Sequence, residues 1–138
     1  MKKFIFRLEK LLEIRAFREN EAKLALGRAV SECEKIKTKI AQIDMDKSTA
    51  RSQMSLENGF SLNSFVANEN YIKLLDLAKE KQLAMLDEAE QKLEAVRSEY
   101  NERLKEFRVL ERLKEKDFAR WKKDYLTEQD NVIDDIKR

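Results

Sequence analysis

The fold is decided by residues 55–64, Ser55-Leu56-Glu57-Asn58-Gly59-Phe60-Ser61-Leu62-Asn63-Ser64, because they hold the clearest break in the chain. The 138-residue sequence has no proline and two glycines, and Gly59 is one of them. Asn58 and Gly59 can adopt the left-handed backbone angles that end a helix, and Asn63 or Ser64 can cap the helix that follows. So few turn-forming residues predict few and long elements.

Apolar residues recur with heptad spacing on both sides of this break. Before it, eleven of fourteen positions at alternating steps of four and three are apolar, in a chain with 42% apolar residues. This spacing predicts one coiled-coil helix on each side. The first seam consists of Leu8, Leu12, Arg15, Glu19, Ala22, Leu26, Ala29, Cys33, Ile36, Ile40, Ile43, Lys47, Ala50 and Met54. The second consists of Ile72, Leu75, Lys79, Gln82, Leu86, Ala89, Leu93, Val96, Tyr100, Arg103, Phe107 and Leu110.

These seams predict an all-α fold in which two long helices form an antiparallel coiled-coil hairpin. We expect a single coiled-coil domain over residues 1–138, with helix 1 at about 3–55, a turn at about 56–63 and a longer helix 2 at about 64–136. The numbers of facing residues should add up to about 119. This register pairs Leu12 with Phe107, Leu26 with Leu93, and Cys33 with Leu86, and it places Ala29 near Ala89.

The same register leaves about twenty residues at the end of helix 2 without a partner in the chain. This overhang carries bulky apolar residues, which on an unpaired helix indicate contact with another molecule. Fraying, or pairing of two overhangs in a dimer, is the alternative. The residues concerned are Phe118, Trp121, Tyr125, Val132 and Ile133.

The residues that usually carry catalysis or bind metals are scarce. The chain has no histidine, and its two isolated glycines cannot form a phosphate-binding loop. Cys33 lies on the first seam, where a buried cysteine acts as a small apolar side chain rather than a nucleophile. A two-helix rod also offers no concave pocket for a substrate. We therefore expect no catalytic site, no metal site, no cofactor and no enzymatic activity.

Charge is unevenly distributed, although the net charge is only +2. Residues 1–18 hold six Lys or Arg and two Glu, and residues 103–123 hold nine Lys or Arg and four acids. The hairpin would place these two stretches side by side, which indicates docking onto an acidic partner. The plainer interpretation is a charged face that is simply solvated. A third interpretation is binding to nucleic acid, but the acids interleaved with the basic residues argue against it.

No stretch of the chain is apolar enough to insert into a membrane. The longest apolar run, near Leu83, has about four residues, against ~20 for a membrane-spanning helix. The start of the chain, with three apolar residues after two lysines, is too short for a secretion signal. We expect a cytoplasmic protein with no direct membrane insertion.

Two stretches resemble one protein family. The opening Phe4-Ile5-Phe6-Arg7-Leu8-Glu9-Lys10-Leu11-Leu12-Glu13-Ile14-Arg15 resembles the start of the flagellar export protein FliJ and of its relatives in type III secretion injectisomes. A second resemblance covers Asn58-Gly59-Phe60, Asn63, Phe65, Tyr71-Ile72 and Leu75. The resemblance implies a non-enzymatic stalk that sits on the hexameric export ATPase, links it to the export-gate membrane protein FlhA and associates with export chaperones. Its location would be peripheral, at the cytoplasmic face of the inner membrane at the flagellar base.

The resemblance and the residues together suggest two binding surfaces. The family's gate-binding residues map onto four positions of helix 2 that are four, three and four residues apart. The last of them is Gln82 here, where the family often has histidine. For Tyr71 and Leu75, ordinary coiled-coil packing is the alternative. The candidate gate-binding residues are Tyr71, Leu75, Ala78 and Gln82. For the ATPase we expect the basic end with its aromatic overhang, since aromatic and arginine side chains dominate binding hot spots. These residues are Phe4, Arg7, Leu11, Arg15, Arg18, Phe118, Trp121 and Tyr125.

Two other functions fit a coiled-coil rod. One is a holdase chaperone that grips unfolded clients between helical arms, and the other is a small nucleic-acid-binding rod. The stalk predicts an export ATPase and FlhA as partners and no nucleic acid. A nucleic-acid-binding rod predicts instead an affinity that falls steeply with salt.

Overall fold

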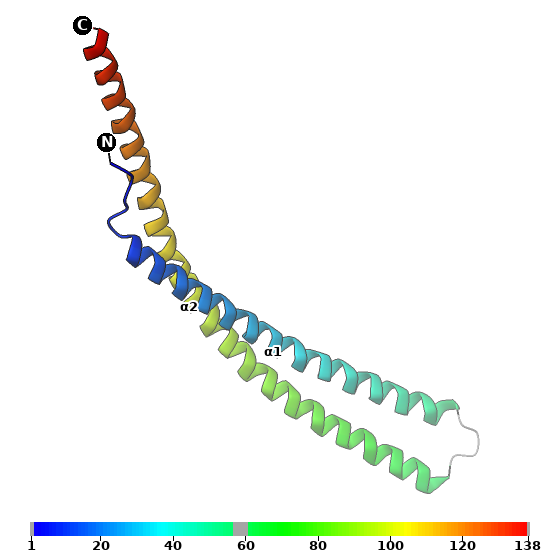
Figure 1. Cartoon of the computed structure of the whole chain (residues 1–138). Coiled ribbons are helices and arrows are strands. Elements are labelled where there is room, and N and C mark those ends of the chain that lie inside the picture. Colours follow the sequence, from blue (N-terminus) through cyan, green and yellow to red (C-terminus); the bar gives the residue numbers. More distant parts are fainter. Residues whose placement is uncertain (1, 57–60, 138) are drawn as a thin grey trace. The chain divides into compact units, whose positions relative to one another are not determined.

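Two helices make up most of the chain (Figure 1). The computed structural model describes residues 2–56 and 61–137. Helix α1 spans Glu9–Leu56 (48 residues) and helix α2 spans Leu62–Lys137 (76 residues), and these described residues contain no strand. The prediction of an all-α fold with two packed helices, the second longer, is confirmed.

Helix α1 begins at Glu9, so the expected start near residue 3 is wrong. The amide of Glu9 donates to the carbonyl of Phe6 at 3.1 Å, and residues 2–6 have no regular structure. The physical reason is packing against α2, which both Phe4 and Phe6 contact with their rings. Two residues that are two positions apart point to nearly opposite sides of a helix, so a helical backbone here could not bring both rings onto α2. We call residues 2–8 the strap.

The N-terminus of α2 is capped by Ser61, where Asn63 or Ser64 was expected. The amide of Ser64 donates to the Ser61 hydroxyl at 3.1 Å, and the amide of Phe65 donates to the Ser61 carbonyl at 3.0 Å. A serine side chain that accepts from the third helical residue is the usual N-cap arrangement. The expected left-handed turn at Asn58 and Gly59 lies outside the described residues.

The chain contains two compact units. The central unit is Ala25–Arg97, and the terminal unit combines Met1–Leu24 with Ser98–Arg138. In the central unit Asp44 Oδ1 accepts from Lys79 Nζ at 2.8 Å, and Lys47 pairs with Asp76. In both pairs the two residue numbers add up to 123, and a constant sum means that the two helices run antiparallel. The expected value of about 119 was therefore off by about one helical turn. That the whole chain is one coiled-coil domain stays a prediction.

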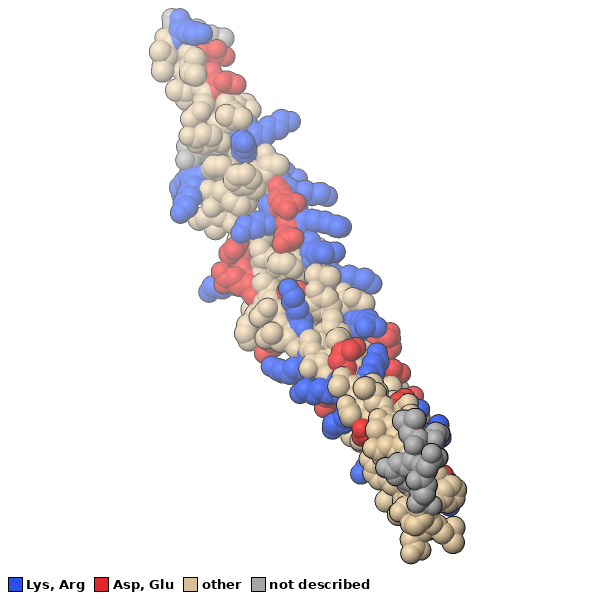
Figure 2. Space-filling view, turned by 90° about the vertical axis from the view of Figure 1, so that its right-hand side faces the viewer, with Lys and Arg blue, Asp and Glu red and all other residues tan. Residues whose placement is uncertain are grey.

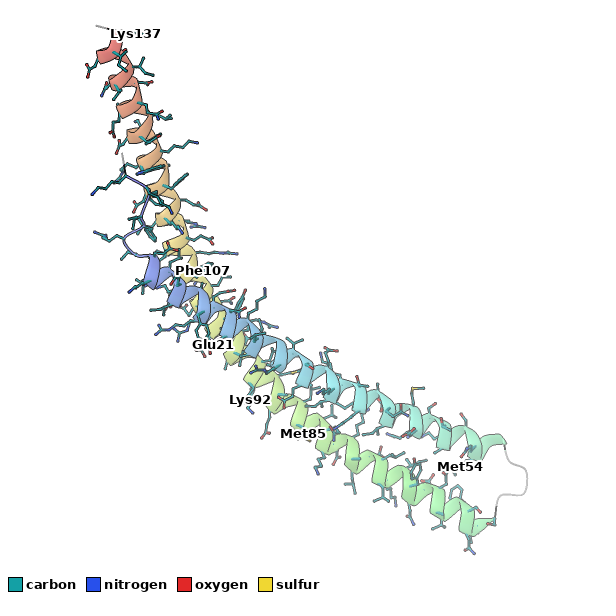
Figure 3. The ribbon with its side chains drawn as sticks, viewed as in Figure 1. Glu21, Met54, Met85, Lys92, Phe107 and Lys137 are labelled. Carbon is teal, nitrogen blue, oxygen red and sulfur yellow. The ribbon has the colours of Figure 1, made fainter. Side chains whose placement is uncertain are left out.

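The same register holds inside the terminal unit, where Lys114 Nζ lies 2.9 Å from Glu9 Oε2 and the two numbers again add up to 123. Its core combines Phe6, Leu12 and Leu110, with Phe4, Leu8, Phe107 and Leu113 packed around them (Figure 3 labels Phe107). The core of the central unit combines Cys33, Ile36 and Ala89 with Ile40, Leu86 and Leu93.

Nearly all of the described buried residues lie on the two predicted seams. Leu12 shares a cluster with Phe107, and Cys33 shares one with Leu86, so these expected neighbours are close although the register is shifted by about one helical turn. The pairing of Leu26 with Leu93 stays a prediction. The seam residues that are buried are Leu12, Cys33, Ile36, Ala50, Ile72, Ala89 and Leu110, and the buried residue outside the seams is Phe6.

Three polar residues on the seams, Arg15, Lys47 and Lys79, make contacts between the helices. Arg15 Nη1 donates to the carbonyl of Glu106 at 3.0 Å, and Lys47 and Lys79 pair with carboxylates of the opposite helix. Gln82 is different, because its Oε1 atom is buried and accepts no hydrogen bond from the described residues. A buried polar atom without a partner lowers stability.

Candidate binding surfaces

The strap lies against α2 within the terminal unit and covers part of the expected overhang. Phe6 is 5% exposed and belongs to the core cluster with Leu12 and Leu110. Trp121 Nε1 donates to the carbonyl of Lys2 at 3.1 Å. The prediction that the end of α2 has no partner in the chain is therefore wrong for Phe118 and Trp121, since strap residues touch both.

Four aromatic residues form a continuous row at this place, which we call the aromatic row: Phe4, Phe118, Trp121 and Tyr125. Phe4 meets Phe118 edge-on, with ring centroids 5.3 Å apart, and lies 5.9 Å from the Trp121 ring. Phe118 and Trp121 stack at 5.8 Å, and Trp121 and Tyr125 stack at 5.4 Å. Phe118 is still 45% exposed, so the row keeps aromatic surface available to a partner.

The other residues expected to contact the ATPase differ in their surroundings. Arg7 and Arg18 are exposed, and Leu11 is 37% exposed. Arg15 is half-buried because its guanidinium donates to the Glu106 carbonyl across the helix pair. Arg15 thus supports helix pairing, whereas the two exposed arginines are free to face a partner.

The expected gate-binding residues lie on α2 in the central unit and differ in exposure. Tyr71 is 46% exposed, but Leu75 and Gln82 are half-buried on the seam. Ala78, which lies outside the second seam, is half-buried too. It lies three residues after Leu75 and four before Gln82, so all three share the side of the helix that α1 partly covers.

Several exposed apolar residues were not expected. On α1, Ile14, Phe17 and Leu24 lie outside the first seam and are each about half exposed or more. Around the start of α2, Leu62, Val66, Leu74 and Leu77 are also exposed. Their successive spacings of three, four, seven or eight residues place them on helix faces offset from the seams, and this was the signal that could have revealed them. Figure 2 shows mostly uncharged atoms around the start of α2, and acidic and basic side chains interleaved along the rest of that face.

Asp76 is the one described carboxylate whose titration is clearly shifted. Its hydrogen bond with Lys47 is the main cause that holds the pKa below the ordinary value of 3.8. Partial desolvation raises the pKa, and the positive charges of Lys47, Arg51 and Lys79 lower it further. The side chain of Asp76 is 49% exposed, so this ion pair is screened by water and fixes register more than it adds stability.

The described residues show neither a metal-binding cluster nor a membrane span. Within residues 2–56 and 61–137, no three Cys, Asp or Glu side chains are placed to hold a metal ion. In the same part of the chain, neither helix is apolar enough over a sufficient length to cross a bilayer.

Comparisons with known proteins give one match. The family model described as "Flagellar FliJ protein" matches residues 3–138, which is nearly the whole chain. Neither the curated proteins nor the solved structures include a match.

Proposed function

The chain belongs to the flagellar FliJ family, whose members are non-catalytic components of the flagellar export apparatus, and on that premise we propose that it acts as a stalk and adaptor. It docks on the hexameric export ATPase and links this ring to the export-gate protein FlhA. It carries out no chemistry itself. It works at the cytoplasmic face of the inner membrane at the flagellar base, where export chaperones are further partners.

The aromatic row is the observation that carries the ATPase assignment. Phe118 is 45% exposed, and Trp121 and Tyr125 are stacked beside it, so a partner can bury a preformed aromatic surface. Rigid aromatic side chains contribute much of the affinity at interfaces because little conformational entropy is lost. The exposed arginines Arg7 and Arg18 lie in the same unit, where positive charge favours encounter with an acidic surface.

The proposed gate contact is Tyr71 with the exposed edges of Leu75, Ala78 and Gln82. Tyr71 offers an amphipathic ring that is about half exposed. Leu75, Ala78 and Gln82 follow Tyr71 along α2 and are half-buried, so they offer less surface than the ring does. Tyr71 is therefore the main anchor in this proposal, and Leu75 supports it from the seam.

Two variants separate the two contacts. Trp121→Ala should weaken binding to the purified export ATPase by about 2 kcal/mol or more and leave binding to the cytoplasmic domain of FlhA unchanged. The double variant Tyr71→Ala, Leu75→Ala should do the reverse. Both are compared with Phe17→Ala, which removes an exposed ring from α1 outside either surface. Equal losses for both partners in both variants would contradict separate sites.

A further inference from the structure

The aromatic row continues toward the end of α2 as an apolar stripe. Tyr125, Gln129, Val132 and Ile136, which we call the C-terminal stripe, follow one another at steps of four, three and four, so they share one face of the helix. Gln129 Nε2 donates to the Tyr125 hydroxyl at 2.8 Å, so the polar groups of these two residues are paired with each other. The apolar side chains of this face beyond them are Val132 and Ile136. These two are 52% and 79% exposed.

Acidic residues follow the same face along one edge. Asp117, Asp124 and Asp135 are separated by seven and eleven residues, which are close to two and three whole helical turns. They therefore lie nearly in line along α2, and Glu128 falls on the same line. Residues 124–138 contain five acids and two bases, so this part of the helix is acidic although the chain as a whole is not.

The strap shows what kind of segment this combination binds. Lys2, Lys3, Phe4 and Ile5 line one shallow depression together with Asp117, Arg120, Trp121 and Asp124 of α2. There the Phe4 ring packs on Phe118 and Trp121, and the Lys2 carbonyl accepts from Trp121 Nε1. A non-helical segment with two lysines and large apolar side chains thus lies on Phe118 and Trp121, just before the C-terminal stripe, and beside Asp117 and Asp124 of the acidic line.

We propose that the C-terminal stripe binds an extended segment of a partner protein that carries Lys or Arg together with aromatic or large aliphatic side chains. Such a segment would lie on Val132 and Ile136 as the strap lies on Phe118 and Trp121, with its basic groups beside Asp124 and Asp135. The same stripe of a second copy is a poor occupant, because two acidic helices repel each other.

A peptide with the sequence of residues 2–7, Lys-Lys-Phe-Ile-Phe-Arg, serves as the probe for the full chain. Binding of the labelled peptide is measured by fluorescence anisotropy, and its site by chemical-shift changes. We expect saturable binding that shifts the signals of Val132 and Ile136 and weakens as salt is raised. A peptide in which glutamate replaces the three basic residues should not bind.

Variants locate the site and separate it from the place that the strap occupies. Val132→Ala with Ile136→Ala should weaken peptide binding by about tenfold or more, and Asp135→Lys should weaken it through charge. Val109→Ala, which removes an exposed side chain elsewhere on α2, is the matched control and should change nothing. The proposal is overturned if neither the double variant nor Asp135→Lys weakens binding, because the peptide would then only replace the strap at Trp121. It is also overturned if both peptides bind equally well, if neither peptide binds, or if the chain forms a dimer by exchanging straps.

Discussion

Replacing Phe4 with alanine is expected to release the strap from α2. The Phe4 ring meets the rings of Phe118 and Trp121 at centroid distances of 5.3 and 5.9 Å. Each aromatic pair contributes about 0.5–1.5 kcal/mol, and half-burial of the Phe4 side chain contributes roughly another 1 kcal/mol. The strap should therefore lose on the order of 2–4 kcal/mol of docking free energy.

Trp121 reports this release directly because it is the single tryptophan of the chain. In the native protein its indole is half-buried and donates to the Lys2 carbonyl. In Phe4→Ala we expect emission at longer wavelength and faster quenching by acrylamide. The helical circular dichroism signal should be retained, since α1 starts only at Glu9. Phe17→Ala removes a ring that is 63% exposed in the same unit and should leave the emission as it is.

Two results would refute this reasoning. Emission and quenching identical to the native protein would mean that the ring contacts do not hold the strap. A loss of helical signal in Phe4→Ala, but not in Phe17→Ala, would mean that the strap is needed for the helices to pair at all.

Three further predictions concern the helix pairing. Leu26→Ala and Leu93→Ala should each destabilise the protein by ~2–5 kcal/mol and show coupling in a double-mutant cycle of denaturant unfolding, and additive effects would contradict their pairing. Gln82→Met should raise the free energy of unfolding by about 1 kcal/mol because it removes a buried oxygen without a partner, and a loss of stability would point to a partner for that oxygen. Since its folded pKa is lowered, ionised Asp76 should stabilise the protein above about pH 4 and cease to do so as pH falls through that pKa. Thermal melts of Asp76→Asn should therefore differ from the native protein near neutral pH and converge at low pH, and a constant difference would contradict the linkage.

The hairpin could be predicted because its information is local and repeated. Each heptad places another apolar side chain on the same face, so an error at one position, such as Arg15 or Lys47, does not change the result. Even these polar seam residues are accommodated, by a backbone carbonyl and by a carboxylate on the opposite helix. The antiparallel register followed from the position of the break, within about one helical turn.

The strap could not be predicted, because its conformation depends on residues more than a hundred positions away. Ile5 lies three residues before Leu8 and continues the first seam, so the local pattern favoured a helix from the start of the chain. Contacts with Phe118 and Trp121 outweigh that preference. The cap of α2 was missed for a simpler reason, since Ser61, Asn63 and Ser64 are all good caps within four residues.

The residue types of the candidate sites could be predicted from the sequence, but the arrangement of these residues in space mostly could not. The aromatic residues of α2 were recognised, but that Phe4 joins them in one row depends on the strap. The half-burial of Ala78 depends on its position between two seam residues, where a small side chain is covered by the neighbouring helix.

The most direct measurement is sedimentation of the chain with the export ATPase and the cytoplasmic domain of FlhA together. An adaptor with separate surfaces on the aromatic row and at Tyr71 predicts a complex that contains all three proteins. Trp121→Ala should release the ATPase alone, and Tyr71→Ala with Leu75→Ala should release the FlhA domain alone. If the two partners instead displace each other from the native chain, they share one surface and the chain cannot link them.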